Sequence, residues 1–273
     1  MSAPGLPLII EPEQLKTALE QQTLLLVDLS QPVTYVQYHL PESVFLDYSW
    51  IVRIEQPRMG LLPQKEQLSH VLGALGMTPD THIVTYDDEG GGRACRFLWT
   101  LDAIGHRNHS LLNGGLQAWV NAGLEVSSKI HYPTPGEDYP VAFNDEPLAS
   151  RQYILDHLSD DNVVLLDCRS SKEYNGEKVM AARGGHIPGA KNIDWVEAMD
   201  KQRDLRLKPE PELRQMLESQ GISPDKTVIT YCHSHHRSAH TYIMLKSLGY
   251  EKVKGYPGSW SDWGNEPNTP IEK

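Results

Sequence analysis

The sequence predicts an α/β protein built as a tandem duplication of one domain, each copy having a mostly parallel sheet flanked by helices. Two observations support this prediction: an internal repeat that runs through most of the chain, and an alternation of strand-like and helix-like segments within each copy. The 273 residues are enough for about two domains of ordinary size. A hydrophobic content of 39% is typical of a chain that folds around a core, which excludes disorder and fibrous repeats.

The internal repeat consists of five blocks that recur in the same order, each between 139 and 147 residues after its first occurrence. The first copy contributes segments 25–28, 39–48, 83–86, 104–106 and 114–119, which match 165–167, 186–195, 228–231, 248–250 and 258–263. Such order at a nearly constant spacing is hard to produce by chance. We therefore expect an N-terminal domain at 1–124, a proline-rich linker at 125–150 and a C-terminal domain at 151–273.

Within the second copy, each expected element follows from its residue pattern. Helices are indicated by apolar residues at helical spacing, by Pro211 and Glu212 in a first turn, and by Gly249 after a last turn. Strands are indicated by short apolar runs rich in β-branched residues. In chain order, we expect a helix at Arg151–Leu158, a strand at Val163–Asp167, a helix at Pro209–Ser219, a strand at Thr227–Tyr231 and a helix at Ser238–Leu248.

Charge and cysteine content narrow the classes of partner. The chain has 25 Lys and Arg against 36 Asp and Glu, a net charge of −11, which disfavours binding to nucleic acid or to acidic membranes. Met1–Ile10 has no basic residue and no long apolar run, unlike a secretory signal. Three cysteines cannot form a disulfide framework. We expect a cytoplasmic monomer with no nucleic-acid or membrane partner.

The segment with the clearest chemistry follows the strand at 228–231 and reads Cys-His-Ser-His-His-Arg-Ser at 232–238. A thiol between a strand and a helix N-terminus lies among backbone N–H groups, and these groups together with Arg237 should lower its pKa. The same donors would hold a small dianion against the sulfur. In the first copy, the matching loop begins with Asp87 and is acidic. We therefore expect catalysis only in the second copy, with Cys232 as the nucleophile.

Three motifs together resemble a known family. They are the Cys-x4-Arg-Ser loop, Gly-His-Ile-Pro-Gly-Ala at 185–190 and Tyr-Pro-Gly-Ser-Trp at 256–260. Over nearly the whole chain, this combination resembles a two-domain rhodanese, a thiosulfate sulfurtransferase, and the Cys-x-x-His-His-Arg-Ser loop is similar to a bacterial branch of that family. The family pairs a catalytic C-terminal domain with an N-terminal domain whose cysteine is replaced, commonly by Asp, as at Asp87.

The resemblance implies ping-pong chemistry through a persulfide on Cys232. The partners would be a small anionic sulfur donor, thiosulfate, and a thiol or cyanide acceptor, and no organic cofactor or metal would be needed. Around the sulfur, the resemblance and the loop together suggest three sets of residues: backbone amides of His233, Ser234 and Ser238 around the persulfide; Arg183, Arg237, His235 and His236 on the donor; and Trp195 at the entrance.

Four alternatives compete with this interpretation. Zinc favours Cys and His, but a tight loop turns amides inward and no second cysteine pair lies nearby. Phosphatases and arsenate reductases use a Cys-x5-Arg loop, one residue longer than the loop at 232–237. A 3-mercaptopyruvate sulfurtransferase typically has an uncharged loop, and the charge of this loop favours a dianion such as thiosulfate. A persulfide carrier or partner-binding module remains compatible with the same residues.

Overall fold

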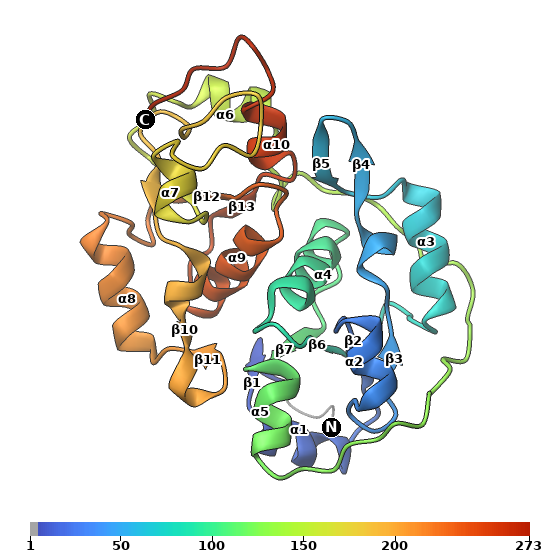
Figure 1. The fold of residues 1–273 in the computed structure, drawn as a ribbon. Helices are drawn as coiled ribbons and strands as arrows, with labels where there is room; N and C mark the ends of the chain where they lie inside the picture. Colours follow the sequence, from blue (N-terminus) through green and yellow to red (C-terminus); the bar gives the residue numbers. More distant parts are fainter. Residues whose placement is uncertain (1–4) are drawn as a thin grey trace. The chain divides into compact units, whose positions relative to one another are not determined.

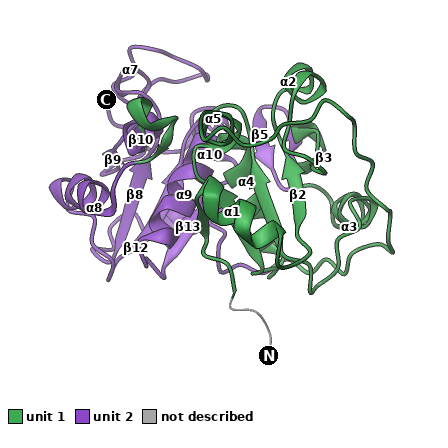
Figure 2. Ribbon diagram, turned by 90° about the horizontal axis from the view of Figure 1, so that it is seen from below, with its two compact units in different colours: residues 1–51, 63–143, 200–207 green, residues 52–62, 144–199, 208–273 purple. Residues whose placement is uncertain are grey.

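The computed structural model describes residues 5–273 and separates into two compact α/β units (Figures 1 and 2). Unit 1 comprises the chain up to residue 51 together with 63–143 and 200–207. Unit 2 comprises 52–62, 144–199 and 208–273. The predicted duplication of an α/β domain with a parallel sheet is confirmed, because both units are built around such a sheet.

Unit 1 contains a five-stranded parallel sheet in the order β1-β7-β6-β2-β3. Its strands are β1 (Ile9–Ile10), β2 (Leu25–Asp28), β3 (Val44–Phe45), β6 (Ile83–Tyr86) and β7 (His109–Leu112). Its helices are α1 (Pro12–Leu19), α2 (Pro32–Gln37), α3 (Lys65–Ala74), α4 (Gly92–Ala103) and α5 (Gly115–Asn121), with a 3-10 helix at Tyr48–Ile51. Helix α4 is buried almost throughout and packs on β6 and β7.

Unit 2 contains a four-stranded parallel sheet in the order β13-β12-β8-β9. Its strands are β8 (Val163–Asp167), β9 (Lys191–Asn192), β12 (Thr227–Tyr231) and β13 (Val253–Gly255). Its helices are α6 (Arg151–Asp156), α7 (Ser171–Tyr174), α8 (Glu210–Ser219), α9 (Arg237–Ser247) and α10 (Ser259–Trp263), with a 3-10 helix at Trp195–Ala198. The expected strands match β8 and β12, and the expected helices match α6, α8 and α9 within two residues at each end.

Two short segments belong to a unit other than the one their sequence position suggests. The antiparallel hairpin of β4 (Arg53–Glu55) and β5 (Arg58–Leu61) lies in the first sequence repeat, yet it packs in unit 2 against α10. Residues 200–207 lie in the second repeat, yet they belong to unit 1, where the amide of Leu207 donates to Asn113 Oδ1. This segment includes a 3-10 helix at Lys201–Arg203 and β11 (Arg206–Leu207), and it begins at the last residue of β10 (Met199–Asp200). The two compact units thus exchange these short segments relative to the two sequence repeats, and the domain split at 1–124 and 151–273 stays a prediction.

The core of unit 2 places the end of β12 at the edge where function is expected. Strands β8 and β12 are buried between helices, and Tyr231 pairs with Asp167 at their carboxyl ends. Side chains of Ile229, Tyr231 and Trp260 form part of one apolar cluster beneath this edge. In open parallel sheets, ligands bind beyond the carboxyl ends of the strands.

Within residues 5–273, no helix is both long and apolar enough to cross a membrane.

Candidate active site

The loop at 232–236 connects β12 directly to α9, as the sequence predicts. The side chain of Cys232 is 1% exposed, and it lies at the N-terminus of α9, the end of a helix where the macrodipole favours negative charge. Cys232 is a free thiol, as are the two other cysteines of the chain. Cys232 is therefore a free thiol that lies where backbone donors can surround its sulfur.

The surroundings of Cys232 favour its thiolate. Burial alone raises the pKa of a thiol, but the charge of Arg237, the hydroxyl of Ser238 and the amides of Ser238 and Ser234 more than reverse that effect, so the pKa of Cys232 is lowered from the usual value. Three donors thus converge on the sulfur. A thiolate, not a thiol, is the nucleophile in cysteine chemistry, and this loop supplies one at a lower pH than a free cysteine does.

His235 positions one of those donors. Its ring is fully buried, and its Nδ1 lies 2.8 Å from the Oγ of Ser238. If Nδ1 carries the proton, it donates to this oxygen and leaves the hydroxyl hydrogen of Ser238 to point at the sulfur. The backbone of His235 has φ of +52°, a left-handed conformation that costs energy for a residue with a side chain. The structure thus places the buried His235 ring against Ser238, and the predicted role of His235 in binding the donor stays a prediction.

Ser259 holds the loop from behind, and sequence reasoning gave it no role. Its Oγ accepts hydrogen bonds from the amides of Cys232, at 3.2 Å, and His235, at 3.1 Å. From the same helix α10, the amide of Trp260 donates to the carbonyl of Cys232 at 2.9 Å. The motif at 256–260 was the available signal, since it contains this serine. Its function is to turn the loop so that other amides face the sulfur.

Arg237 does not stand as a free cation. It forms a bidentate ion pair with Glu173, with N–O distances of 2.8 and 2.9 Å. Desolvation would raise the pKa of Glu173, but Arg237 and the hydroxyl of Ser170 lower it to about 2. Burial and the charge of Arg237 also lower the pKa of His233. The loop carries less positive charge than its sequence suggests, so its charge favours a dianion less strongly than expected.

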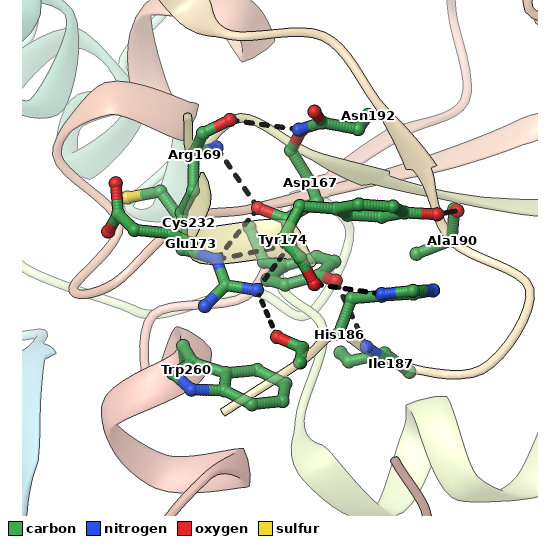
Figure 3. Close-up of polar contacts among 12 residues, drawn as sticks. Asp167, Arg169, Glu173, Tyr174, His186, Ile187, Ala190, Asn192, Cys232 and Trp260 are labelled. Atoms are coloured by element: carbon green, nitrogen blue, oxygen red, sulfur yellow. Dashed lines mark hydrogen bonds and ion pairs between the residues drawn. The ribbon is translucent and has the colours of Figure 1, made fainter. Parts of the chain in front are cut away.

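A fully buried ion pair supports the same edge of the sheet (Figure 3). Arg169 donates to Asp167, with an Nη2–Oδ2 distance of 2.6 Å, and to the carbonyl of Gly185 at 2.7 Å. The guanidinium carbon lies 4.3 Å from the ring centroid of Trp260. Asp167 and Arg169 therefore form a structural ion pair within unit 2. Removing one member of such a buried pair costs about 3–5 kcal/mol, because the other charge is left without compensation.

Arg183 contacts the C-terminal segment rather than the loop. Its two terminal nitrogens donate to the carbonyls of Trp263, Glu266, Pro267 and Thr269 and to the hydroxyl of Thr269. These bonds engage the N–H groups that would otherwise bind a sulfonate. These contacts tie the segment after α7 to residues 263–269, and the predicted role of Arg183 in binding the donor stays a prediction.

Trp195 and His236 lie together at the loop. Their ring centroids are 5.9 Å apart, and Trp195 also makes an edge contact with His240 at 5.4 Å. Trp195 and His236 are both half-buried, so each keeps part of its surface accessible. The structure thus brings Trp195 next to the catalytic loop, and its role at an entrance stays a prediction.

The corresponding loop of unit 1 holds an anion of its own. The carboxylate of Asp87 accepts hydrogen bonds from four backbone amides, those of Glu89, Gly91, Arg93 and Ala94, at 2.7–3.0 Å. Burial and the charge of Glu89 raise the pKa of Asp87 to about 6, although these amides oppose the shift. The fold of the loop is retained, but its cradle is filled by a side chain that is not a sulfur nucleophile.

Among the described residues, no three His, Cys, Asp or Glu side chains gather in a way that could hold a metal ion. The cluster at 232–240 is spread by the loop: His235 faces Ser238, while His236 and His240 face Trp195.

Glu173 is a second site residue that sequence reasoning did not assign. Its signal was the pattern Ser170-x-x-Glu173, a capping box that begins α7.

Fold and site together define a cysteine-dependent group-transfer protein on a duplicated α/β scaffold. The Rhodanese-like domain family matches this chain at residues 11–122 and 150–266. The chain belongs to that family.

Relatives agree with this assignment, and a solved structure shares the fold. The chain is 47% identical to a thiosulfate sulfurtransferase of Azotobacter vinelandii, with 98% of each chain covered, and 45% identical to one of Pseudomonas aeruginosa, with 98% and 97% covered. It is 30% identical to a 3-mercaptopyruvate sulfurtransferase of Escherichia coli K12, over 87% of this chain and 84% of that one. An anaerobic ergothioneine biosynthesis enzyme from Chlorobium limicola has the same fold, with a TM-score of 0.88 at 21% identity over 97% of this chain and 70% of that chain.

Proposed function

We propose that this protein is a thiosulfate sulfurtransferase that passes sulfane sulfur to cyanide or a thiol through a persulfide on Cys232. The observation that carries the proposal is the Cys232 thiolate, held by the amides of Ser234 and Ser238 and the hydroxyl of Ser238. The choice of thiosulfate rests on the two relatives of that name at 45–47% identity over nearly the whole chain.

In the first step, the thiolate of Cys232 attacks the outer sulfur of thiosulfate. The S–S bond of the donor breaks, its electron pair leaves with sulfite, and a persulfide anion remains on Cys232. The donors that stabilise the thiolate also face this anion, and Arg237 adds a positive charge near it. No proton transfer is required, which agrees with a loop in which His235 is buried and His233 has a lowered pKa.

In the second step, cyanide or a thiolate attacks the terminal sulfur of the persulfide. The sulfur leaves as thiocyanate or as a new persulfide, and the thiolate of Cys232 returns. The charge balance is the same before and after the cycle. Trp195 and His236 lie side by side at the loop and are both half-buried, which supports a role for their accessible surfaces at the entrance.

Steady-state kinetics test this proposal. Parallel double-reciprocal plots with thiosulfate and cyanide support it, because sulfite leaves before the acceptor binds. Cys232→Ser should lose activity, and Cys168→Ser is the matched control, because Cys168 is also a fully buried free thiol of unit 2. Higher kcat/KM with 3-mercaptopyruvate than with thiosulfate would replace the donor. A persulfide that forms once but does not turn over with cyanide or thiols would indicate a carrier.

We also propose that the protein acts as a monomer in the cytoplasm. The three free thiols support a reducing compartment. Light scattering coupled to size exclusion tests the monomer: a mass near 30.7 kDa supports it, and twice that mass contradicts it.

A further inference from the structure

The hairpin of β4 and β5 is part of the catalytic unit. It comes from residues 52–62 of the first sequence repeat, and it packs on α10 of unit 2, the helix that holds the loop from behind (Figure 2). The amide of Met59 donates to the Oγ of Ser261 at 2.8 Å, and the amide of Ser261 donates to the carbonyl of His233 at 2.9 Å. A short chain of contacts therefore links the hairpin to the loop.

Gly60 touches the loop itself. A Cβ on Gly60 would overlap the carbonyl oxygen of Ser234, would lie 2.6 Å from the carbonyl carbon of Ser234, and would lie 3.0 Å from the carbonyl oxygen of Pro257. All of these are backbone atoms, which cannot rotate away as a side chain does. Gly60 also has φ of +76°, a conformation that favours glycine. Two independent constraints therefore require glycine here.

The Ser234–His235 peptide that Gly60 touches directly follows the His233–Ser234 peptide, whose N–H is the Ser234 amide. The amide of Ser234 donates to Cys232, while the carbonyl of the same residue faces Gly60. On the other side of that carbonyl, the next amide, of His235, donates to Ser259 Oγ at 3.1 Å. Because the N–H and C=O of one peptide point in opposite directions, Ser259 and Gly60 contact the Ser234–His235 peptide from opposite sides.

We propose that Gly60 is a positioning residue for the catalytic loop. Because Gly60 has no side chain, the hairpin packs directly against the Ser234–His235 peptide and thereby orients the Ser234 amide toward Cys232. The hairpin of the inactive repeat is thus a working part of the active unit. This inference rests on the proposed function for its meaning in turnover, but its direct readout is the reactivity of Cys232, which does not depend on the sulfur donor.

The test compares Gly60→Ala with Gly221→Ala. Gly221 has a similar φ of +72°, but a Cβ there would meet nothing within 4 Å, so this control adds the backbone strain without the clash. The measurement is the rate of iodoacetamide alkylation of Cys232 as a function of pH. Gly60→Ala should move the midpoint upward by about one pH unit and lower kcat about tenfold, since one lost charge-assisted hydrogen bond is worth about that factor. Gly221→Ala should leave both unchanged.

A second variant keeps the test decisive if Gly60→Ala does not fold. Ser261→Ala removes the acceptor for the Met59 amide and leaves its own amide bond to His233 intact. It should move the alkylation midpoint in the same direction by a smaller amount. An unchanged midpoint in folded Gly60→Ala, or in Ser261→Ala where Gly60→Ala fails to fold, would overturn the inference. If wild-type protein fails to turn over thiosulfate while the Gly60→Ala midpoint still moves, the proposed function fails and the positioning role stands.

Discussion

The ion pair between Glu173 and Arg237 makes a quantitative prediction about acid stability. Glu173 is 3% exposed, and its two carboxylate oxygens accept hydrogen bonds from the two terminal nitrogens of Arg237. Its pKa lies at about 2 in the folded protein, against 4.5 ordinarily. Since each pH unit of difference corresponds to about 1.4 kcal/mol, ionised Glu173 contributes about 3 kcal/mol to the free energy of unfolding at pH 7.

The direction of the pH dependence of stability follows from the lowered pKa of Glu173. A carboxyl whose pKa is depressed on folding stabilises the protein above pH 4.5, and this contribution is lost as the pH falls toward 2. At pH 3, roughly 1.4 kcal/mol should remain, because the folded protein is still mostly ionised at this position while the unfolded chain is mostly protonated.

Glu173→Gln tests this reasoning, because it keeps the shape of the side chain and removes its charge. Urea unfolding at pH 7 should show a loss of about 3 kcal/mol relative to wild type, and the gap should narrow by about 2 kcal/mol at pH 3. Glu177→Gln is the control, since Glu177 is exposed in the same part of the chain. A gap that stays constant from pH 7 to pH 3, or an equal loss in Glu177→Gln, would refute the reasoning.

Three further substitutions test the role of Ser238 as a donor to the sulfur, the structural role of Arg183, and the role of Asp87 in the loop of unit 1. Ser238→Ala should raise the alkylation midpoint of Cys232 by about one pH unit, because the thiolate loses a hydroxyl donor; an unchanged pH profile would exclude this donor. Arg183→Ala should lower stability by about 2–4 kcal/mol, since it leaves carbonyls at 263–269 without a donor, yet leave the KM for thiosulfate unchanged; a raised KM with normal stability would return Arg183 to the donor site. Asp87→Ala should destabilise unit 1 by about 2–4 kcal/mol, because four amides lose their acceptor; calorimetry showing no loss would contradict the cradle described for Asp87.

The catalytic loop could be predicted because its signals are local. A β-branched run ends at Tyr231, a helix pattern begins at Arg237, and a cysteine stands between them. The repeat added the rest, since the alignment of the two copies set Asp87 against Cys232. Local pattern and duplication are therefore enough to locate the nucleophile and to separate the active copy from the inactive one.

The supporting contacts could not be predicted, because they join residues distant in sequence. Glu173 meets Arg237 across 64 positions, Ser259 meets Cys232 across 27, and Arg183 reaches carbonyls 80–86 positions away. Spacing placed Arg183 just before the motif at 185–190, but the direction of its side chain depends on the packing of the C-terminal segment. The charge of an arginine in a sequence likewise does not reveal whether a carboxylate already neutralises it.

The hairpin at 52–62 shows the same limit at the level of domains. Its sequence lies inside the first repeat, and nothing in its residue pattern indicates that it packs on α10. Only the tertiary structure places Gly60 against Ser234. The division of the chain into two repeats describes its duplication, whereas the two folded units also depend on the exchange of these short segments.

The most direct test of the account is the mass of the intact protein after incubation with excess thiosulfate, measured before and after addition of cyanide. We expect a gain of one sulfur atom, located on Cys232 by peptide mapping, and its complete removal by cyanide with release of thiocyanate. The Cys232→Ser variant should gain nothing. A gain that persists in Cys232→Ser, or no gain in the wild-type protein with thiosulfate, would contradict the central claim that Cys232 carries the transferred sulfur.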